Sequence, residues 1–190
     1  YVNEGYFLRA MYEYDGRIFA SASYRRDASS RFHPDHRWGN FWSVGAAWII
    51  NRESWFNAPV VNMLKIKASY GSQGNDAIGM YKYTDLYSVT NDGNDGISIM
   101  FGAKGNPNIT WETNANLNIG AEFGLWNDRL SGSLDFFYRK TSDMLFSVPV
   151  APSMGYSSYY DNIGDMANTG IEVVLNGDIF RTRNVVWSVN

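Results

Sequence analysis

A cluster of arginines and histidines lies in one short segment, residues 24–38, which reads YRRDASSRFHPDHRW. Four arginines and both histidines of the chain lie there: Arg25, Arg26, Arg31, Arg37, His33 and His36. These residue types suit a nucleic-acid surface, a metal site or the rim of a binding surface. Asp27 and Asp35 reduce the net charge of the segment to about +2, which is too small for a footprint on phosphates. The whole chain carries a net charge of −3, so no global field attracts polyanions, and we predict no nucleic-acid partner.

Two segments resemble metal sites. His33 and His36 flank Asp35, but Pro34 disfavours a helix that would align them, and zinc needs three or four rigid ligands. The chain has no cysteine and no third histidine, so a solvated loop is the better interpretation. The segment 91–96, NDGNDG, begins like a calcium loop, but Gly96 stands where the EF-hand pattern needs Asp or Asn. We interpret it as a turn, with an accidental calcium site as the alternative, and predict no metal and no cofactor.

Glu122 and Asp135 are the carboxylates best placed to act as a hydrolase pair, because they fall on the polar side of consecutive predicted strands. A glycosidase also needs a set distance between its carboxyl groups and one raised pKa. Lysines and arginines share this polar side, so ion pairs are the expected arrangement. The sequence has no Ser/His/Asp set and no phosphate-binding glycine loop. We predict that the protein is not an enzyme.

The elements that position these residues are strands, because apolar and polar residues alternate along most of the chain. Period-two alternation predicts about eight strands, at residues 6–14, 17–25, 41–50, 64–70, 114–123, 130–139, 171–176 and 185–189. Most are long for a globular protein, where strands average about 5–6 residues, and approach the ~9–11 residues of membrane-barrel strands. Charged residues make up only 18% of the chain and aromatic residues 16%, and Gly and Asn are plentiful, which suits strands and turns better than helices.

The connections alternate in length. Short turns are predicted at Asp15-Gly16, 126–128 and 181–184, a moderate junction at 51–62, and long connections at 27–40, 73–111 and 142–168. A transmembrane barrel has short turns at one rim and long loops at the other. The N-terminus is neither a signal peptide nor a start methionine, and the C-terminus stops inside an apolar alternating run, so we expect a fragment of a larger protein.

The two faces of the predicted strands differ in polarity. One is apolar with aromatic residues near its ends; the other would line a wet lumen. The candidate ligand-binding residues on the lumen side are Arg9, Glu13, Arg25, Lys65, Lys67, Glu122, Asp135 and Arg139. Loop aromatics, among them Tyr83 and Trp111, suit stacking on sugar rings or contact with a partner. For any single one of them, packing of the loops against themselves is the preferred interpretation, whereas as a set they fit a surface that meets a ligand or a partner.

Ordered blocks of the sequence resemble a known family. They read RRDASSRF, RWGNFWSVGAAW, LKIKASYGSQGN, NPNITWET, NIGAEFGLWNDRLSGSLDFFYRKTSDML and NIGDMANTGIEVVL. Their order and residues resemble the C-terminal barrel region of SusC/RagA-type TonB-dependent outer-membrane transporters of Bacteroidota. Ala28 stands where that family often has Gly, and Trp42 where it often has Pro.

The resemblance implies that residues 1–190 are part of a 22-stranded barrel, without its plug domain and first strands. It implies residence in the outer membrane, contact with lipid, and import of nutrients, with oligosaccharides or other glycans as the first choice and peptides as the second. It also implies a SusD-like surface lipoprotein partner and energy from the TonB complex through the absent plug. Two other hypotheses remain from the residues alone: a self-contained small barrel with a structural or adhesive role, and a soluble β-rich carbohydrate-binding module.

Overall fold

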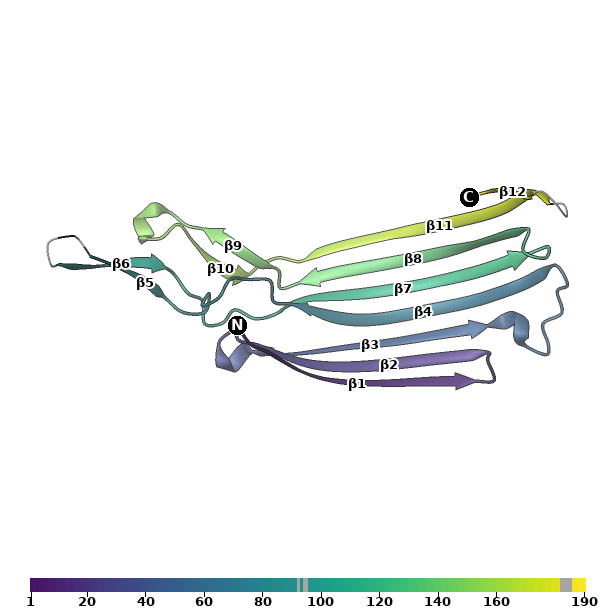
Figure 1. Cartoon of the computed structure of the whole chain (residues 1–190), viewed down its shortest axis with the longest axis horizontal. Coiled ribbons are helices and arrows are strands. Elements are labelled where there is room, and N and C mark those ends of the chain that lie inside the picture. The colour runs from purple at the N-terminus through teal and green to yellow at the C-terminus, as the bar shows by residue number, and fades with distance from the viewer. Residues whose placement is uncertain (92, 94–95, 182–185) are drawn as a thin grey trace.

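The protein is built on one antiparallel sheet of eight strands, described here from a computed structural model that covers residues 1–91, 93, 96–181 and 186–190. The strands are β1 (Asn3–Tyr14), β2 (Ile18–Ser29), β3 (Trp38–Ile49), β4 (Val61–Asn75), β7 (Glu112–Leu125), β8 (Leu130–Ser142), β11 (Met166–Arg181) and β12 (Val186–Val189). They follow one another across the sheet in this order (Figure 1). The eight strands predicted from the alternation are therefore confirmed.

The sheet is open, because β1 and β12 form its two opposite edges in the described part of the chain. A self-contained eight-stranded barrel requires its first strand to pair with its last. The hypothesis of a small closed barrel is therefore wrong. An open, curved sheet of long strands is instead the expected form of one sector of a larger barrel wall.

The short and long connections lie at opposite ends of the strands (Figure 1). Asp15 and Gly16 both have positive φ, at 50° and 61°, which gives the tight hairpin that Asp-Gly predicts. The turn from β7 to β8 has three successive residues with positive φ, Trp126, Asn127 and Asp128. The third predicted short turn, at 181–184, falls largely outside the described residues.

The long connections contain more structure than the sequence predicted. Two hairpins stand apart from the main sheet: β5 (Leu86–Asn91) with β6 (Ile97–Ala103), and β9 (Leu145–Pro149) with β10 (Ser158–Asn162). Both project beyond the sheet at its long-loop end (Figure 1). The tip of the first hairpin carries the predicted calcium-like segment, of which Asp92, Asn94 and Asp95 lie outside the described residues.

The predicted long connection from Asp27 to Asn40 is wrong in its bounds. Strands β2 and β3 continue to pair there, with Asp27 opposite Gly39 and Ala28 opposite Trp38. Arg26 therefore lies within a strand, whereas the predicted strand ended at Arg25. The backbone hydrogen bonds between β2 and β3 continue beyond the residues in which apolar and polar side chains alternate. The alternation therefore predicted that these strands end too early.

Three short 3-10 helices complete the described structure: η1 (Pro34–His36), η2 (Ile50–Arg52) and η3 (Pro152–Met154). Pro34 occupies the first turn of η1, where its missing N–H is tolerated. None of the helices in the described ranges is long and apolar enough to cross a membrane.

The apolar face of the sheet is exposed along its length. Its large side chains face away from the protein interior, including Leu8 at 70% exposure, Tyr12 at 62% and Ile171 at 68%. Only five hydrophobic residues are buried in the described part of the chain, namely Phe32, Phe41, Ile50, Ile78 and Ile109. A soluble two-sheet module would bury this face between its sheets, so that hypothesis is wrong as well.

Aromatic residues bound the apolar face at both ends. Trp38 and Trp48 lie ten positions apart on β3, which corresponds to about 33 Å along the strand. With the tilt of about 40° usual in membrane barrels, their separation across the membrane is about 25 Å, the height of the apolar band of such barrels. Trp48 packs near Trp55, with 6.2 Å between the ring centroids.

Candidate functional site

The polar face of the sheet carries a compact cluster of ion pairs between Lys65, Lys67, Glu122 and Asp135. The Lys67 ammonium lies 2.9 Å from a carboxylate oxygen of Glu122 and 2.9 Å from one of Asp135. Lys65 contacts the other oxygen of Glu122 at 3.2 Å. The ion pairs expected from the sequence are confirmed. Each carboxylate is thus engaged by at least one lysine.

The register of the sheet explains why Lys67 reaches Asp135. Gly120 stands between them, opposite Lys67 on β4 and opposite Asp135 on β8. A Cβ atom at Gly120 would lie 2.1 Å from an Asp135 carboxylate oxygen and 2.7 Å from Lys67 Cε. The absence of a side chain at Gly120 therefore leaves the space in which the lysine crosses an entire strand to its partner.

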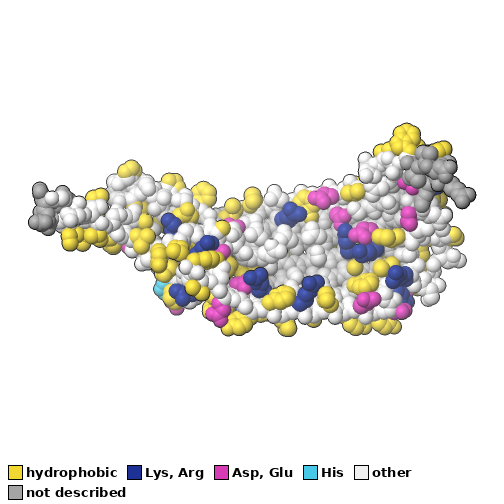
Figure 2. Space-filling view, viewed as in Figure 1, with side chains coloured by type: hydrophobic (Ala, Val, Ile, Leu, Met, Phe, Trp, Pro, Cys, Tyr) yellow, Lys and Arg dark blue, Asp and Glu magenta, His cyan; other side chains and the backbone are white. Residues whose placement is uncertain are grey.

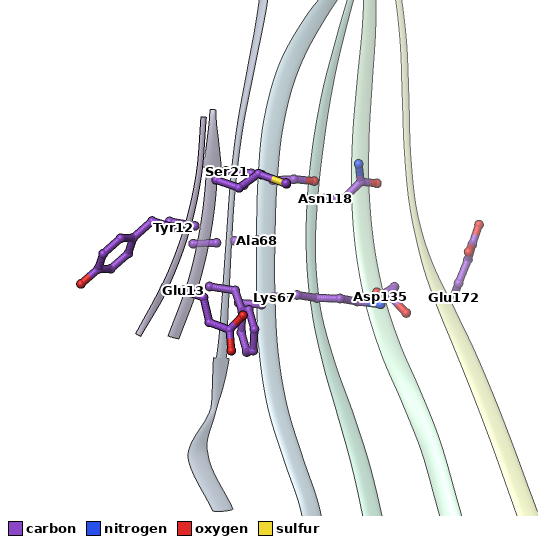
Figure 3. Close-up of a pocket in the computed structure, with 15 residues that line it drawn as sticks. Tyr12, Glu13, Ser21, Lys67, Ala68, Asn118, Asp135 and Glu172 are labelled. Atoms are coloured by element: carbon purple, nitrogen blue, oxygen red, sulfur yellow. Dashed lines mark ion pairs between the residues drawn. The ribbon is translucent and has the colours of Figure 1, made fainter. Parts of the chain in front are cut away.

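The cluster lies within a broad hollow on this face, with a volume of about 920 Å³. Its lining includes Glu13, Ser21, Ser69, Lys67, Asn118, Asp135 and Glu172. Glu13, Lys67, Gly120, Asp135 and Glu172 share one row of cross-strand positions, which runs from β1 to β11. In Figure 3 the Lys67 side chain points along this row to Asp135, whereas the Tyr12 ring points away from the hollow.

Charged side chains are spread over this face of the sheet, and hydrophobic ones are prominent along its borders (Figure 2). Arg9 lies opposite Ser23 in the register of β1 and β2. Arg139 lies opposite Asn116 on β7, with its guanidinium carbon 5.0 Å from the centre of the Phe137 ring. The structure thus places both arginines on the polar face and outside the lysine–carboxylate cluster.

A second hollow of about 700 Å³ adjoins the long-loop end of the same face. Arg25 lines it together with Phe41, Gln73, Trp111 and Asp27. The Arg25 Nε atom lies 2.6 Å from an oxygen of Asp27. Arginine, amide and aromatic groups here meet at the mouth of the channel that the face would line.

Asp76, the first residue after β4, ties the loops together at this end. Its carboxylate accepts a hydrogen bond from the Ser29 hydroxyl at 2.7 Å and lies 3.5 Å from the Arg31 guanidinium. Arg31 also donates to the Asp76 main-chain carbonyl at 2.7 Å, and its guanidinium carbon lies 4.2 Å from the centre of the Tyr1 ring. The arginine-rich segment therefore braces the rim through a carboxylate 45 residues further along the chain.

Around this brace the loops form a small core of their own. Phe32 and Ile109 are fully buried, and Tyr83, Trp111, Leu145 and Tyr160 pack against the buried cluster. The Trp111 indole N–H donates to the Arg37 carbonyl at 2.9 Å. Tyr83 lies edge-on to His33, with 5.9 Å between the ring centroids. Both candidate aromatics are thus partly buried within the loops, and Trp111 also lines the second hollow.

The β5–β6 hairpin is held at its base by Asp85. The Asp85 carboxylate accepts the Gly105 backbone N–H at 2.8 Å and pairs with Lys104 at 3.1 Å. These two contacts, the hydrogen bond first, hold the pKa of Asp85 below its ordinary value. Further out, the Tyr87, Phe101 and Tyr156 rings follow one another with centroid distances of 5.4 and 5.8 Å.

In the ranges that the structure describes, no group of three or more His, Cys, Asp or Glu side chains is arranged to hold a metal ion. His33 Nδ1 lies 3.3 Å from the Asp35 carboxylate.

Sequence reasoning missed two residues on which the site depends. The sequence does contain a signal for Gly120, because it is the glycine between Asn118 and Glu122 among the alternate residues that form the polar face of its strand. Asp76 had none, since its partners Ser29 and Arg31 are more than forty residues away and only the folded loops bring them together.

Comparison with known proteins gives a consistent result over the whole chain. A family model described as "TonB dependent receptor-like, beta-barrel" matches residues 1–190. TonB-dependent receptor P26 of Formosa agariphila is 35% identical over 186 residues, which is 96% of this chain and 19% of the relative. TonB-dependent receptor SusC of Bacteroides thetaiotaomicron is 32% identical over 194 residues, 97% of this chain and 19% of SusC. The chain thus spans about a fifth of the length of these relatives.

Solved structures agree. The RagAB peptide importer in its closed-closed state superposes with a TM-score of 0.89 at 35% identity, over 95% of this chain and 20% of that chain. The siderophore receptor PirA of Pseudomonas aeruginosa has a TM-score of 0.61 at 17% identity, over 98% of this chain and 32% of that chain. The likeness to PirA is one of fold alone.

Proposed function

Because the chain belongs to the TonB-dependent receptor-like β-barrel family, we propose that the whole protein imports a nutrient across the outer membrane and performs no catalytic step. The chain is a sector of an outer-membrane β-barrel wall, with its apolar face toward lipid. We assign the polar face, with the Lys67–Glu122–Asp135 cluster and its hollow, to the lumen. The observation that carries the proposal is this polar, hollowed face, which continues to the mouth formed by the long loops.

We propose oligosaccharides as the first class of substrate. The clustered charges of the large hollow largely neutralise one another in ion pairs. Neutral hydrogen-bonding groups such as Ser21, Ser69 and Asn118 line the hollow as well. Hydroxyl and amide groups are suited to a neutral, polyhydroxylated ligand. Loop aromatics at the mouth add flat apolar faces for sugar rings.

A peptide substrate is the second candidate. It is favoured by one observation, the close structural likeness to an importer whose name gives peptides as its cargo. Arg9 and Glu13 on the polar face offer charged partners for peptide termini or side chains.

The proposed partners are a SusD-like surface lipoprotein over the long loops and the TonB complex on the opposite side of the membrane. Similarity to SusC supports the first. The RagAB importer has been solved in closed-closed and open-open states, which supports a moving lid. The exposed β5–β6 hairpin, with Val89 at 65% and Ile97 at 74% exposure, offers apolar surface at the same end.

The test uses the full-length receptor in its host. Deletion of its gene should abolish uptake of one labelled oligosaccharide or peptide class, and the full-length gene should restore it. Dissipating the proton gradient should also stop uptake in the complemented strain. A Lys67→Met variant should reduce uptake several-fold at unchanged surface level, whereas Lys140→Met, which alters a lysine paired with Asp165 on the outer side, should not. Unchanged uptake of both classes after deletion would contradict an import role.

A further inference from the structure

The outward face of the sheet is almost free of charge, and its few charged residues are confined to one end. The strand positions that share a face with Trp42 on β1, β2, β3, β4, β7 and β8 carry three charged residues: Glu4, Arg26 and Lys140. All three lie close to the long-loop end of their strands. The outward charges therefore mark the level at which the apolar band gives way to the polar head groups of the membrane.

Arg26 differs from Lys140, the other cation on this face of strands β1 to β8. Lys140 is paired with Asp165 at 2.9 Å, and on the polar face Arg25 is paired with Asp27. Arg26 forms no ion pair within the described ranges of the chain, and its side chain is exposed. An unpaired cation at the edge of an apolar band needs an anionic partner or water at this level.

Arg26 lies beside two stacked aromatic rings. Its central carbon lies 4.8 Å from the centre of the Trp38 ring, and Tyr6 stacks on Trp38 with 6.1 Å between centroids and 18° between planes. A guanidinium over an indole keeps its N–H donors at its edge free for a second partner. The guanidinium can thus donate hydrogen bonds to a planar or tetrahedral anion.

A recess opens beside Trp38. It has a volume of about 180 Å³, and its lining includes Glu4, Ser30, Arg37 and Trp38. The Arg37 side chain already donates through Nε to the Phe32 carbonyl, which fixes its position. Glu4, which lines the recess, accepts a hydrogen bond from the Tyr6 hydroxyl at 2.6 Å.

We propose that Arg26, Trp38 and Tyr6 form a head-group site that binds the phosphate of an anionic lipid in the outer leaflet. The site faces away from the hollows of the polar face, so an imported ligand would not reach it from the lumen. Its level, at the upper edge of the apolar band, is that of lipid phosphates and not of acyl chains. The acyl chains of the lipid would run over Leu8, Tyr24 and Trp42, which are exposed below it on the same face.

The experiment measures lipid binding to the full-length receptor in neutral detergent by native mass spectrometry. The probes are dioleoyl phosphatidylglycerol and, as the phosphate-free control, dioleoylglycerol. Arg26→Gln should weaken binding of the phospholipid by about tenfold, the value of one charge-assisted hydrogen bond, and leave dioleoylglycerol unchanged. Arg26→Lys should fall between Gln and the natural residue, because it keeps the charge without the planar fork.

Two further variants sharpen the result. Arg139→Gln is the matched control, since Arg139 also lies over an aromatic ring but on the polar face, and it should bind the phospholipid normally. Glu4→Gln should strengthen binding, because it removes the only carboxylate among the described residues that line the recess. The proposal is overturned if Arg26→Gln binds as the natural protein does, or if Arg26→Gln and Arg139→Gln lose the same affinity. A heat-modifiability gel on each variant confirms that the barrel is folded.

Discussion

Gly120 is the residue that lets one lysine serve two carboxylates on different strands. Lys67 contacts Glu122 diagonally on the neighbouring strand and Asp135 one strand beyond. The second contact exists only because nothing projects from the strand between them. Lysine and aspartate side chains of this kind are partly exposed, at 38% and 27%, so solvent screens the pair and its net contribution is small. Its effect on the shape of the lumen is the larger consequence.

We predict that Gly120→Ala separates Lys67 from Asp135. The added methyl group would displace two flexible side-chain ends, so the expected cost is about 1 kcal/mol, at the low end for overpacking. The measurement is the midpoint of urea unfolding of the full-length barrel in detergent. Gly177→Ala is the control, because the nearest atom to a Cβ there is 4.0 Å away. Equal effects of the two variants would show that the loss of glycine itself, and not the ion pair, is responsible.

Asp85 provides a prediction about pH. Its folded-state pKa is lowered by the Gly105 N–H and by Lys104, so its contact stabilises the hairpin base above the ordinary pKa of aspartate. That contribution is lost as the pH falls through the lowered pKa. We expect the rate at which pepsin cleaves the β5–β6 hairpin to differ between pH 4 and lower pH, rising as the pH falls, after correction for cleavage of unfolded receptor at each pH. In Asp85→Asn this corrected difference should disappear, and its persistence would contradict the role of Asp85.

At the scale of the elements, the strands could be predicted from the sequence and the loops could not. In strand β7 the apolar residues Ala115, Leu117, Ile119, Ala121 and Phe123 occupy every second position. This period of two residues is that of a strand and not the 3.6-residue period of a helix. The alternation also places Glu122 on the same face as lysines and arginines, which was sufficient to predict that it would form an ion pair. The loop hairpins are short strands without a lipid face, so they carry no comparable alternation over a long stretch.

The rim of loops depends on contacts that local sequence does not encode. Asn162 donates to the Thr110 carbonyl and accepts its N–H, which joins the β8–β11 connection to the β4–β7 connection. Glu112 at the start of β7 accepts the Leu145 N–H. Asparagine and aspartate are the expected residues of any loop, so their types predict a turn but not the distant partner. The folded rim is therefore one body made from three connections.

We predict that Asp76→Ala loosens this body. The fully buried Ser29 hydroxyl would lose its acceptor, and Arg31 would lose its carboxylate, at a cost of about 1–3 kcal/mol. Trypsin should then cut after Arg31 or Arg37 several-fold faster in folded receptor. Asp35→Ala is the control in the same loop, because its side chain is 80% exposed, and it should leave the cleavage rate near that of the natural protein. Equal protection in both variants would show that Asp76 is not the brace.

At the scale of the whole molecule, the central assignment to test is that the apolar face of the sheet contacts lipid. Val44 and Ser43 are neighbours near the middle of β3, and the pleat turns them to opposite faces. Val44 is 47% exposed beside Tyr70, whereas the Ser43 hydroxyl lies 2.7 Å from the Ser23 hydroxyl on the polar face.

An arginine at each position therefore tests the orientation of the wall. Val44→Arg should cost about 2–4 kcal/mol, the value for arginine at the bilayer midplane of a barrel, and should sharply reduce the amount of folded receptor in the outer membrane. Ser43→Arg places the same charge in the lumen, beside the second hollow, and should assemble at nearly the normal level while altering uptake. Quantitative blotting of outer-membrane fractions measures both. If Ser43→Arg were the variant that failed to assemble and Val44→Arg were tolerated, the faces would be assigned the wrong way round, and the lumen, the hollows and the head-group site would have to exchange sides with them.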